Sequence, residues 1–458
     1  MMIKNPKLFN LSRFPLLLLC ILLFHSCSGS TDSSTEDPDE RPDGSIVKHI
    51  YNFGGSQDDL AYSMDTTIDG GVIITGNFYS NDEDFENLNN GDSDIFVIKL
   101  DENGILEWIN TFGGSTGDSG LSIIQTGDNG FALAGTSRSN DGEFSDLNKG
   151  FWDIVVIKLN PSGEKEWINT YGGSGRDEGL SITETTDGGL VVTGLSESND
   201  QDFEGLNKGG WDIFALKIDF SGNLDWINTY GGSSGEIAHS VSATSDGGVV
   251  ITGGRGSIDG DFENSGNGNI FLLKLGKDGD LEWINTFGGS GRENGFSVVQ
   301  STDNGFIITG TSEAEDGDFT DAGIGNMFVI KTNSDGDLLW SRKFGGSNEE
   351  EGREIIETAN GDIVFTGWTR SGDGDFTGKF RGGSDIAIFR LQPDGNMKWI
   401  KLIGGTGRDR SYVIREKASG SLILAGSTSS RNYDFENRDS VDLDIVVAKI
   451  TVEGSLKR

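Results

Sequence analysis

Cysteine and histidine are the scarcest reactive residues of this 458-residue chain, which has two of the first and three of the second. One of each falls within residues 1–26, a segment with the marks of a secretory signal. Without that segment only Cys27, His49 and His239 remain, so neither an internal disulfide nor a thiol pair can form. No Ser-His-Asp order stands out either, which disfavours an enzyme and gives no candidate catalytic residue.

Basic residues are also few. Lys and Arg number 36 against 73 Asp and Glu, a formal net charge of −37. Such a chain repels nucleic acid and anionic lipid headgroups, so we expect no nucleic-acid partner and membrane contact through a lipid anchor only.

A helical pattern is missing too, because no segment shows a 3.6-residue period and 70 glycines are too many for helices.

The first 45 residues have an order typical of export and anchoring. A basic start is followed by a short apolar core over residues 14–24 and by Ser26-Cys27. The core is too short to span a membrane. The segment resembles a bacterial lipoprotein signal, which implies that residues 1–26 are removed and that Cys27 takes the lipid; an ordinary signal peptide is the alternative. Residues 27–45 are polar and acidic, and we expect a disordered tether.

From residue 46 onward the chain is a repeat. An aromatic-Gly-Gly-Ser tetrad recurs in steps of 59, 59, 59, 57, 57 and 59 residues, with Ile-Gly-Gly-Thr in the last copy. The tetrads begin at Phe53, Phe112, Tyr171, Tyr230, Phe287, Phe344 and Ile403. Internal periods of this length indicate one repetitive architecture instead of the two or three domains that length alone suggests.

Each copy contains four short strands, which we call A, B, C and D in chain order. In the second copy they are expected at residues 121–125, 131–134, 153–159 and 166–171. An Asn-Gly turn at Asn129 joins the first two, and a Pro-Ser-Gly turn joins the last two. Four antiparallel strands at a fixed period describe a propeller blade. The sequence therefore predicts an all-β fold, a seven-bladed β-propeller over residues 46–458.

The two chain ends predict how the ring closes. The last copy stops where its strand D should begin, and residues 46–53 form an unpaired strand D at the other end. We expect residues 46–53 to complete the seventh blade beside residues 444–450, which removes an exposed sheet edge.

Some positions hold one residue type in every copy. Glycine ends strand B, which indicates a close backbone approach or a positive φ. Strand C opens with Asp or Asn and has a basic residue five positions later. An acidic residue follows each Gly-Gly-Ser by three positions. Six copies have Trp in strand D. Because seven equal sets do not make one active site, we interpret them as packing residues and as charged latches within or between blades. The tryptophans are Trp108, Trp167, Trp226, Trp283, Trp340 and Trp399.

The loop between strands B and C contains Asp-x-Asp-Phe or a close variant. Alternating carboxylates bind Ca²⁺ through oxygen, but no copy has the full EF-hand pattern. Asp side chains also cap turns by accepting backbone N–H bonds, so loop structure is the favoured interpretation and Ca²⁺ the alternative; no other cofactor is expected. The pairs are Asp82/Asp84, Asp141/Glu143, Asp200/Asp202, Asp259/Asp261, Asp316/Asp318, Asp373/Asp375 and Asn432/Asp434.

The long B–C loops and the D–A connections share one end of each blade, and binding residues tend to lie on such elaborated loops. Trp152 and Trp211 are found there, and we predict them as ligand-binding residues on a face for sugar rings or a protein partner. Packing over the end of the sheet is the structural alternative for both.

Five motifs follow one another in the repeat: Gly-Gly-Ser…Asp, Thr-x-Asp-Gly-Gly, apolar-Thr-Gly, Asp-Phe and Asp-Ile-Phe-Val-Ile-Lys-Leu…Gly…Trp. Their order resembles β-propeller repeats of the SBBP kind over residues 46–456. The layout is similar to kelch repeats, although their double glycine appears only at Gly253-Gly254. The resemblance implies a non-catalytic protein of the bacterial surface or envelope.

Three function classes follow. We favour a monomeric binding or scaffolding lipoprotein of the cell envelope, at the outer membrane, for an unidentified protein or glycan. The second class is a carbohydrate-binding, lectin-like module; the hairpin ending in Trp is similar to bulb-type lectins, whose Gln-x-Asp-x-Asn-x-Val-x-Tyr motif is absent. The third and least favoured class is a propeller enzyme.

Overall fold

A computed structural model describes residues 47–263, 265–266, 268–320, 323, 325–435 and 442–450. The predicted signal peptide, the lipid-bearing Cys27 and the tether over residues 27–45 lie outside the described residues. In the part of the chain that is described, no helix has both the length and the apolar character needed to cross a membrane.

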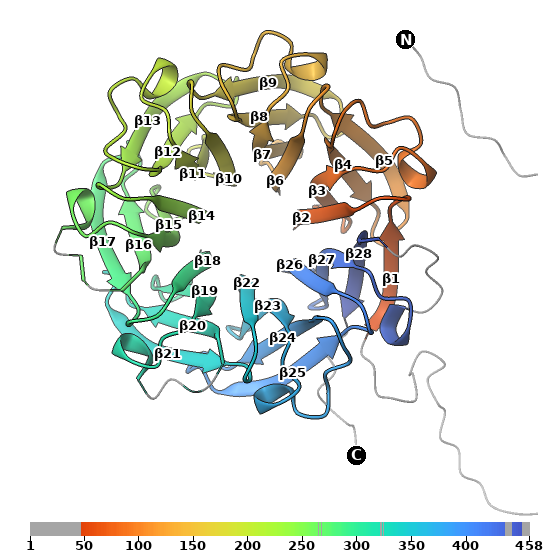
Figure 1. Ribbon diagram of the computed structural model, residues 1–458, viewed down its shortest axis with the longest axis vertical. Helices are drawn as coiled ribbons and strands as arrows, with labels where there is room; N and C mark the ends of the chain where they lie inside the picture. Colours follow the sequence, from red (N-terminus) through yellow and green to blue (C-terminus); the bar gives the residue numbers. More distant parts are fainter. Residues whose placement is uncertain are drawn as a thin grey trace, which may run out of the picture. The chain divides into compact units, whose positions relative to one another are not determined.

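Seven antiparallel sheets of four strands each stand around a common axis (Figure 1). Strand A is innermost and comprises β2 (Asp59–Thr66), β6 (Asp118–Gln125), β10 (Asp177–Glu184), β14 (Glu236–Ala243), β18 (Glu293–Gln300), β22 (Glu350–Glu357) and β26 (Asp409–Glu416). Strand B comprises β3 (Val72–Phe78), β7 (Phe131–Ser137), β11 (Leu190–Ser196), β15 (Val249–Arg255), β19 (Phe306–Ser312), β23 (Ile363–Thr369) and β27 (Leu422–Thr428).

Strand C comprises β4 (Asp94–Leu100), β8 (Asp153–Leu159), β12 (Asp212–Ile218), β16 (Ile270–Leu275), β20 (Met327–Thr332), β24 (Asp385–Leu391) and β28 (Asp444–Ile450). The outer strand D comprises β1 (Val47–Phe53), β5 (Leu106–Phe112), β9 (Lys165–Tyr171), β13 (Leu224–Tyr230), β17 (Leu281–Phe287), β21 (Leu338–Phe344) and β25 (Met397–Ile403). The seven-bladed β-propeller predicted from the repeat is confirmed.

The predicted closure is confirmed as well. The sheet order β1-β28-β27-β26 makes the first strand of the chain the fourth strand of the last blade. In this antiparallel pair Phe53 lies opposite Ile445 and Tyr51 opposite Val447. Blade 7 therefore consists of the two ends of the propeller, and the ring has no open sheet edge at this seam.

The apolar core lies between the blades. The strand-B segment Leu190–Ser196 and the strand-C segment Asp212–Ile218 are buried throughout. One core cluster joins Ile154 and Val156 of blade 2 to Val192 and Phe214 of blade 3. Because each blade is covered on both faces, its central strands read as continuous apolar runs instead of an alternating pattern.

The glycine that ends strand B is required by a close backbone approach. A Cβ on Gly76 would lie 1.8 Å from the carbonyl oxygen of Leu60, and one on Gly135 would lie 2.1 Å from that of Ser119. The neighbouring strand A shifts its register at this point, as between Gly120 and Ser122. The bulge pushes a carbonyl against strand B, which leaves no space for a side chain.

The recurrent tryptophan packs between blades, as predicted, although it is half-buried and not fully buried. Trp108 lies under the C–D turn of the next blade, where a Cβ on Gly163 would come within 2.9 Å of the indole. Gly163 has a φ of +81°, and its carbonyl accepts a hydrogen bond of 2.6 Å from Asn110 Nδ2. Each outer strand is thereby fastened to its neighbour.

The recurrent bases and acids do not pair with each other. Lys158 Nζ lies 2.9 Å from Asp128 Oδ2 in the A–B turn of its own blade, and the same pairing recurs along the ring. The other pairs are Lys99–Asp69, Lys217–Asp187, Lys274–Asp246, Lys331–Asp303 and Arg390–Asp362. The acid that follows each Gly-Gly-Ser accepts hydroxyl and amide hydrogen bonds instead, as Asp177 does from Ser198 and Gly173.

Candidate functional site

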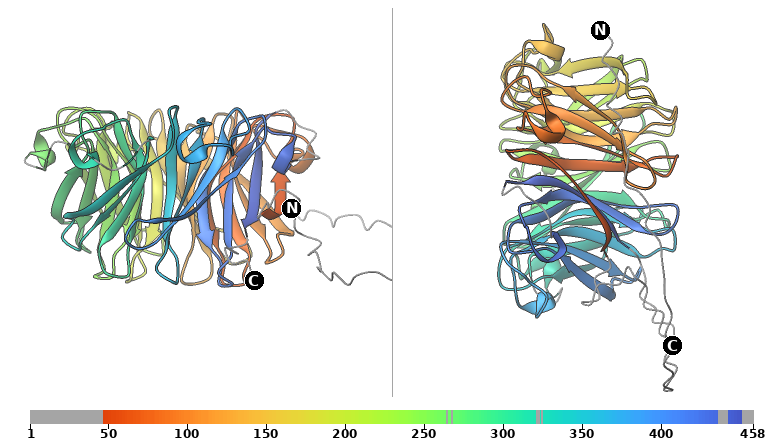
Figure 2. Two further views of the ribbon diagram at one scale, coloured as in Figure 1. Left: turned by 90° about the horizontal axis from the view of Figure 1, so that it is seen from below. Right: turned by 90° about the vertical axis from the view of Figure 1, so that its right-hand side faces the viewer.

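One end of the propeller is built from the B–C loops and the D–A connections, and we call it the loop end (Figure 2). Every B–C loop contains a 3₁₀ turn that the sequence did not predict. The turns are η1 (Glu83–Phe85), η2 (Gly142–Phe144), η3 (Gln201–Phe203), η4 (Gly260–Phe262), η5 (Gly317–Phe319), η6 (Gly374–Phe376) and η7 (Tyr433–Phe435). They coincide with the Asp-x-Asp-Phe motifs.

The carboxylates of this motif bind backbone amides. Asp202 Oδ2 accepts a hydrogen bond of 2.9 Å from the amide of Gly172, and Asp200 Oδ1 accepts one of 2.8 Å from that of Ser174. Phe203 is fully buried, with its ring centroid 5.8 Å from that of Phe214. The motif thus caps the D–A connection and plugs the loop onto the sheet. Among the described residues, no group of three or more His, Cys, Asp or Glu side chains is placed to hold a metal ion.

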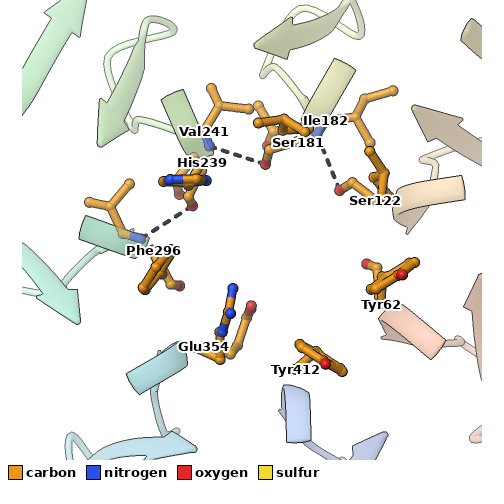
Figure 3. Close-up of a pocket in the computed structure, with 18 of the residues that line it drawn as sticks. Tyr62, Ser122, Ser181, Ile182, His239, Val241, Phe296, Glu354 and Tyr412 are labelled. Carbon is orange, nitrogen blue, oxygen red and sulfur yellow. Dashed lines mark hydrogen bonds between the residues drawn. The ribbon is translucent and has the colours of Figure 1, made fainter. Parts of the chain in front are cut away.

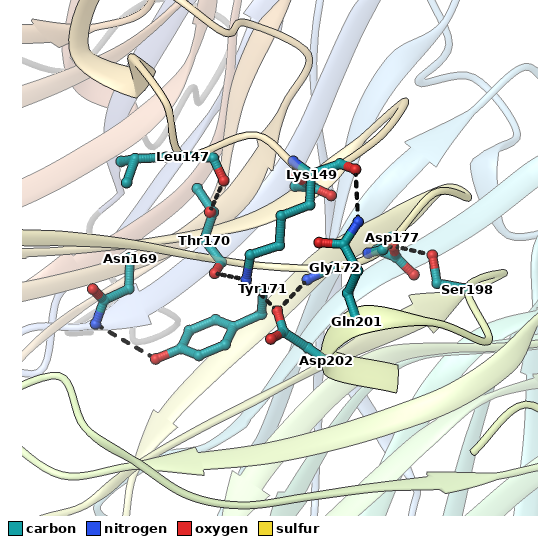
Figure 4. A network of polar contacts seen from close by, with 12 residues as sticks. Leu147, Lys149, Asn169, Thr170, Tyr171, Gly172, Asp177, Ser198, Gln201 and Asp202 are labelled. Carbon is teal, nitrogen blue, oxygen red and sulfur yellow. Dashed lines mark hydrogen bonds and ion pairs between the residues drawn. The ribbon is translucent and has the colours of Figure 1, made fainter. Parts of the chain in front are cut away.

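Cations join these loops across blade seams, as Figure 4 shows for blades 2 and 3. Lys149 of blade 2 pairs with Asp202 of blade 3, and its Nζ also donates a bond of 3.0 Å to the carbonyl of Thr170. The same latch joins Lys208 to Asp261 and Arg381 to Asp434. Lys208 therefore belongs to a blade seam, where it pairs with Asp261.

Trp152 and Trp211, the predicted binding residues, both lie at the loop end, on adjacent blades. Trp211 is 41% exposed and Trp152 is half-buried beside Phe151, which is 56% exposed. The Arg138 guanidinium lies 5.1 Å from the Trp152 ring centroid and 5.2 Å from that of Phe151.

Arg176 connects the two tryptophans. Its backbone forms a parallel bridge with Trp152, and its guanidinium lies 5.6 Å from the ring centroid of Trp211. Its Nε also lies 2.6 Å from Glu178, which fixes the side chain. Arg138, Phe151, Trp152, Arg176 and Trp211 form one line of alternating cations and rings, which we call the arginine–aromatic row. The sequence identified its two tryptophans, whereas its two arginines could not be placed without the fold.

A second candidate is the central channel, a cavity of about 420 Å³ lined by strand A of every blade (Figure 3). Five serines form a ladder around it, each accepting a hydrogen bond from a backbone amide of the next blade at 3.1 or 3.2 Å. The serines are Ser63, Ser122, Ser181, Ser240 and Ser297.

The ladder stops at blades 6 and 7, where Glu354 and Val413 replace serine. Glu354 Oε1 lies 2.5 Å from Nη1 of Arg415, whose Nε lies 3.5 Å from Oδ1 of Asp65. Burial raises the pKa of Glu354, and the Arg415 charge opposes that rise. Burial in the channel, with a smaller effect of the Arg353 charge, lowers the pKa of His239 to about 3, so this imidazole is neutral at physiological pH.

Among the described residues, pairs of buried carboxylates occupy at least four blade seams near the loop end. Burial raises the pKa of Asp153 to about 6, and the charge of Asp177 adds to the rise. Asp153 Oδ2 accepts the amide of Lys149, but Oδ1 has no hydrogen-bond partner among the described residues. Asp94, Asp212 and Asp385 repeat this arrangement, with pKa values raised to about 6, about 6 and about 7. Blades 4 and 5 have Asn269 and Asn326 at the same position.

The comparisons with known proteins do not assign the chain to a family. No protein-family model matches it. The regulatory protein FlaEY of Caulobacter vibrioides is 26% identical over 186 residues, 39% of this chain and 18% of that protein, so the match spans less than a fifth of this relative.

Two solved structures align with most of this chain. The crystal structure of BamB from Moraxella catarrhalis aligns over 85% of both chains, with 13% identity and a TM-score of 0.39. A protein of unknown function from Dyadobacter fermentans aligns over 88% of this chain and 99% of its own, with 12% identity and a TM-score of 0.40. The likeness to both is one of fold.

Proposed function

We propose that this chain is a non-catalytic binding or scaffolding propeller of the bacterial envelope that contacts its partner through the loop end. The observation that supports this proposal is the arginine–aromatic row. Phe151 and Trp211 expose their rings there beside the Arg138 and Arg176 guanidiniums, of which Arg176 is paired with Glu178, on a chain whose net charge is −37. Trp and Arg are the side chains that most often dominate binding energy at protein interfaces.

The rest of the loop end is rigid, which favours binding over conformational change. Asp200 and Asp202 accept backbone amide hydrogen bonds, and the ion pair between Lys149 and Asp202 joins adjacent blades. A side chain that is held in place loses little entropy when a partner binds. The row thus presents preorganised rings on a fixed scaffold.

The envelope address is part of the proposal and depends on the sequence. The lipoprotein-like signal and Cys27 would anchor the chain, at the outer membrane, and residues 27–45 would tether the propeller. The likeness to SBBP-type repeats supports the same assignment, and we expect the propeller to act as a monomer. Catalysis is disfavoured because neutral His239 packs on Phe296, with ring centroids 4.8 Å apart, and its Nε2 atom has no hydrogen-bond partner among the residues that the structure describes.

The test is partner binding by the mature chain with Cys27→Ser, which removes the lipid and leaves the propeller intact. Envelope proteins captured by this chain are identified and then titrated against it. We expect Trp211→Ala to weaken binding at least about tenfold, as hot-spot truncations do. Phe220→Ala is the matched control, because Phe220 is also an exposed aromatic ring, 36% exposed, but lies in a C–D turn at the opposite end. Equal losses in both variants, or none in Trp211→Ala, would exclude the row.

A carbohydrate partner is the second candidate, favoured by the exposed ring of Trp211. Sugars stack on such rings through their apolar faces. A glycan array probed with the same soluble chain separates the two classes: specific glycans lost in Trp211→Ala support the lectin-like module, whereas an empty array leaves the protein partner.

A further inference from the structure

The central channel has two unlike walls. Strands A of blades 2 and 3 contribute Leu121 and Leu180, whereas those of blades 5 to 7 contribute Phe296, Arg353 and Tyr412 (Figure 3). All of these residues line the same cavity of about 420 Å³, a volume within the range of small-molecule sites. The channel therefore combines an apolar side with an aromatic, cationic side.

The repeat itself shows that the cation is not needed for packing. The fourth residue of strand A is Tyr62, Leu121, Leu180, His239, Phe296, Arg353 and Tyr412 in the seven blades. Six blades form the same strand and the same seams without a guanidinium at this position. The charge of Arg353 thus requires an explanation other than the fold.

Arg353 is held between aromatic rings. Its guanidinium lies 4.4 Å from the ring centroid of Phe296 and 5.5 Å from that of Tyr412. Tyr62 packs edge-on against Tyr412 with centroids 5.7 Å apart, which fixes the second ring. Rings on both sides orient the guanidinium before any ligand arrives.

Two nitrogen atoms on this wall are buried and lack a hydrogen-bond partner among the described residues. They are Nε of Arg353 and Nε2 of His239. The Arg353 Nη2 atom pairs with Glu351, so the Nε edge of the guanidinium is the one without an acceptor. Buried groups of this kind are rare in folded proteins, because an unmade bond costs free energy.

We propose that the channel binds a small monocarboxylic acid with an aromatic or branched apolar body. The carboxylate accepts a charge-assisted hydrogen bond from Arg353 Nε, and the apolar body lies against Leu121 and Leu180. Neutral His239 provides the second polar contact. Glu354 and Asp65 both pair with Arg415, whereas Arg353 pairs with Glu351 and keeps its Nε donor for the ligand. This site is independent of the arginine–aromatic row.

The experiment uses the mature chain with Cys27→Ser and 3-phenylpropionate as the probe, with 3-phenylpropionamide as its uncharged match. Titration calorimetry should show the acid binding at least tenfold more tightly than the amide. Isobutyrate, benzoate and phenylacetate, titrated in the same way, sample other apolar bodies. Failure of all four acids to bind at millimolar concentration, or equal affinity for acid and amide, overturns the proposal without any variant.

The variant is Glu351→Ser/Arg353→Leu, which installs in blade 6 the residues that blade 2 has as Ser119 and Leu121. It removes the cation together with its partner, so no buried charge is left unpaired. We expect at least a tenfold loss of acid affinity and little change for the amide. Arg370→Leu, an arginine outside the channel lining, should leave both affinities unchanged; acid binding that survives the double variant overturns the assignment.

Discussion

Asparagine should stabilise the propeller at Asp153, and only where the aspartate would be ionised. The side chain is fully buried beside Asp177, and its Oδ1 has no hydrogen-bond partner among the described residues. Blades 4 and 5 already have Asn at this position, and Asn269 Nδ2 donates a bond of 3.0 Å to the carbonyl of Gly291. Asp153→Asn thus gives blade 2 the residue that blades 4 and 5 have at this position.

The magnitude follows from the shift. The pKa of Asp153 is raised from its ordinary 3.8 to about 6. The folded protein holds the Asp153 proton more tightly than the unfolded chain does. Between pH 4 and 6 the unfolded chain therefore loses this proton first, and the free energy of unfolding of the wild type falls as the pH rises through this range. A shift of roughly two units corresponds to about 3 kcal/mol. Solvent screening and relaxation near the loop end reduce this, and we expect about 1–2 kcal/mol.

The assay is urea denaturation of wild type and Asp153→Asn at pH 4.5 and pH 8. The variant should gain about 1–2 kcal/mol of unfolding free energy over wild type at pH 8, and clearly less at pH 4.5, where most of the folded aspartate is still protonated. Asp202→Asn is the control, because Asp202 pairs with Lys149 and its replacement should destabilise at pH 8. A difference for Asp153→Asn that is the same at both pH values, or a variant less stable at pH 8, would refute the reasoning.

Three further outcomes follow from the fold. A chain beginning at residue 57 lacks β1, so its calorimetric melting should lose cooperativity; melting like the full propeller would contradict closure by this strand. Trp108→Ala should lower the free energy of unfolding, measured by urea denaturation, by about 2–3 kcal/mol, which is below the range for a fully buried Trp. A loss under about 1 kcal/mol would show that the contact with Gly163 does not stabilise the fold. Titration with Ca²⁺ should show no uptake by the Asp-x-Asp-Phe loops, because backbone amides occupy Asp200 and Asp202; stoichiometric heat would contradict this.

The ring was predictable because the sequence contains seven copies of one four-stranded unit. Seven copies fix the strand order, and Asp153–Leu159 has the predicted bounds while Phe131–Ser137 extends three residues further. The 3₁₀ turns escaped notice although four copies have Asp-Gly-Asp-Phe or Asp-Gly-Glu-Phe, and the residue after the first Asp has a positive φ, +59° at Gly142 and +52° at Gln201. Glycine at that position was the signal.

The channel could not be predicted in the same way. Arg353 and Tyr412 lie in strands that read as ordinary copies of the repeat, and only the closed ring brings them around one axis. Their departure from the leucines of blades 2 and 3 was visible in the sequence, but its meaning depends on distances between blades. The latch between Lys149 and Asp202, which are 53 residues apart, was hidden for the same reason.

The strand that closes the ring, β1, also determines at which end the chain enters the propeller. Val47 lies opposite Ile450, at the end of blade 7 where the short C–D turns are found, and Phe53 leads into the loop end. The chain therefore enters the disc from its plain side. Val47 thus lies at the end of the propeller opposite to the arginine–aromatic row.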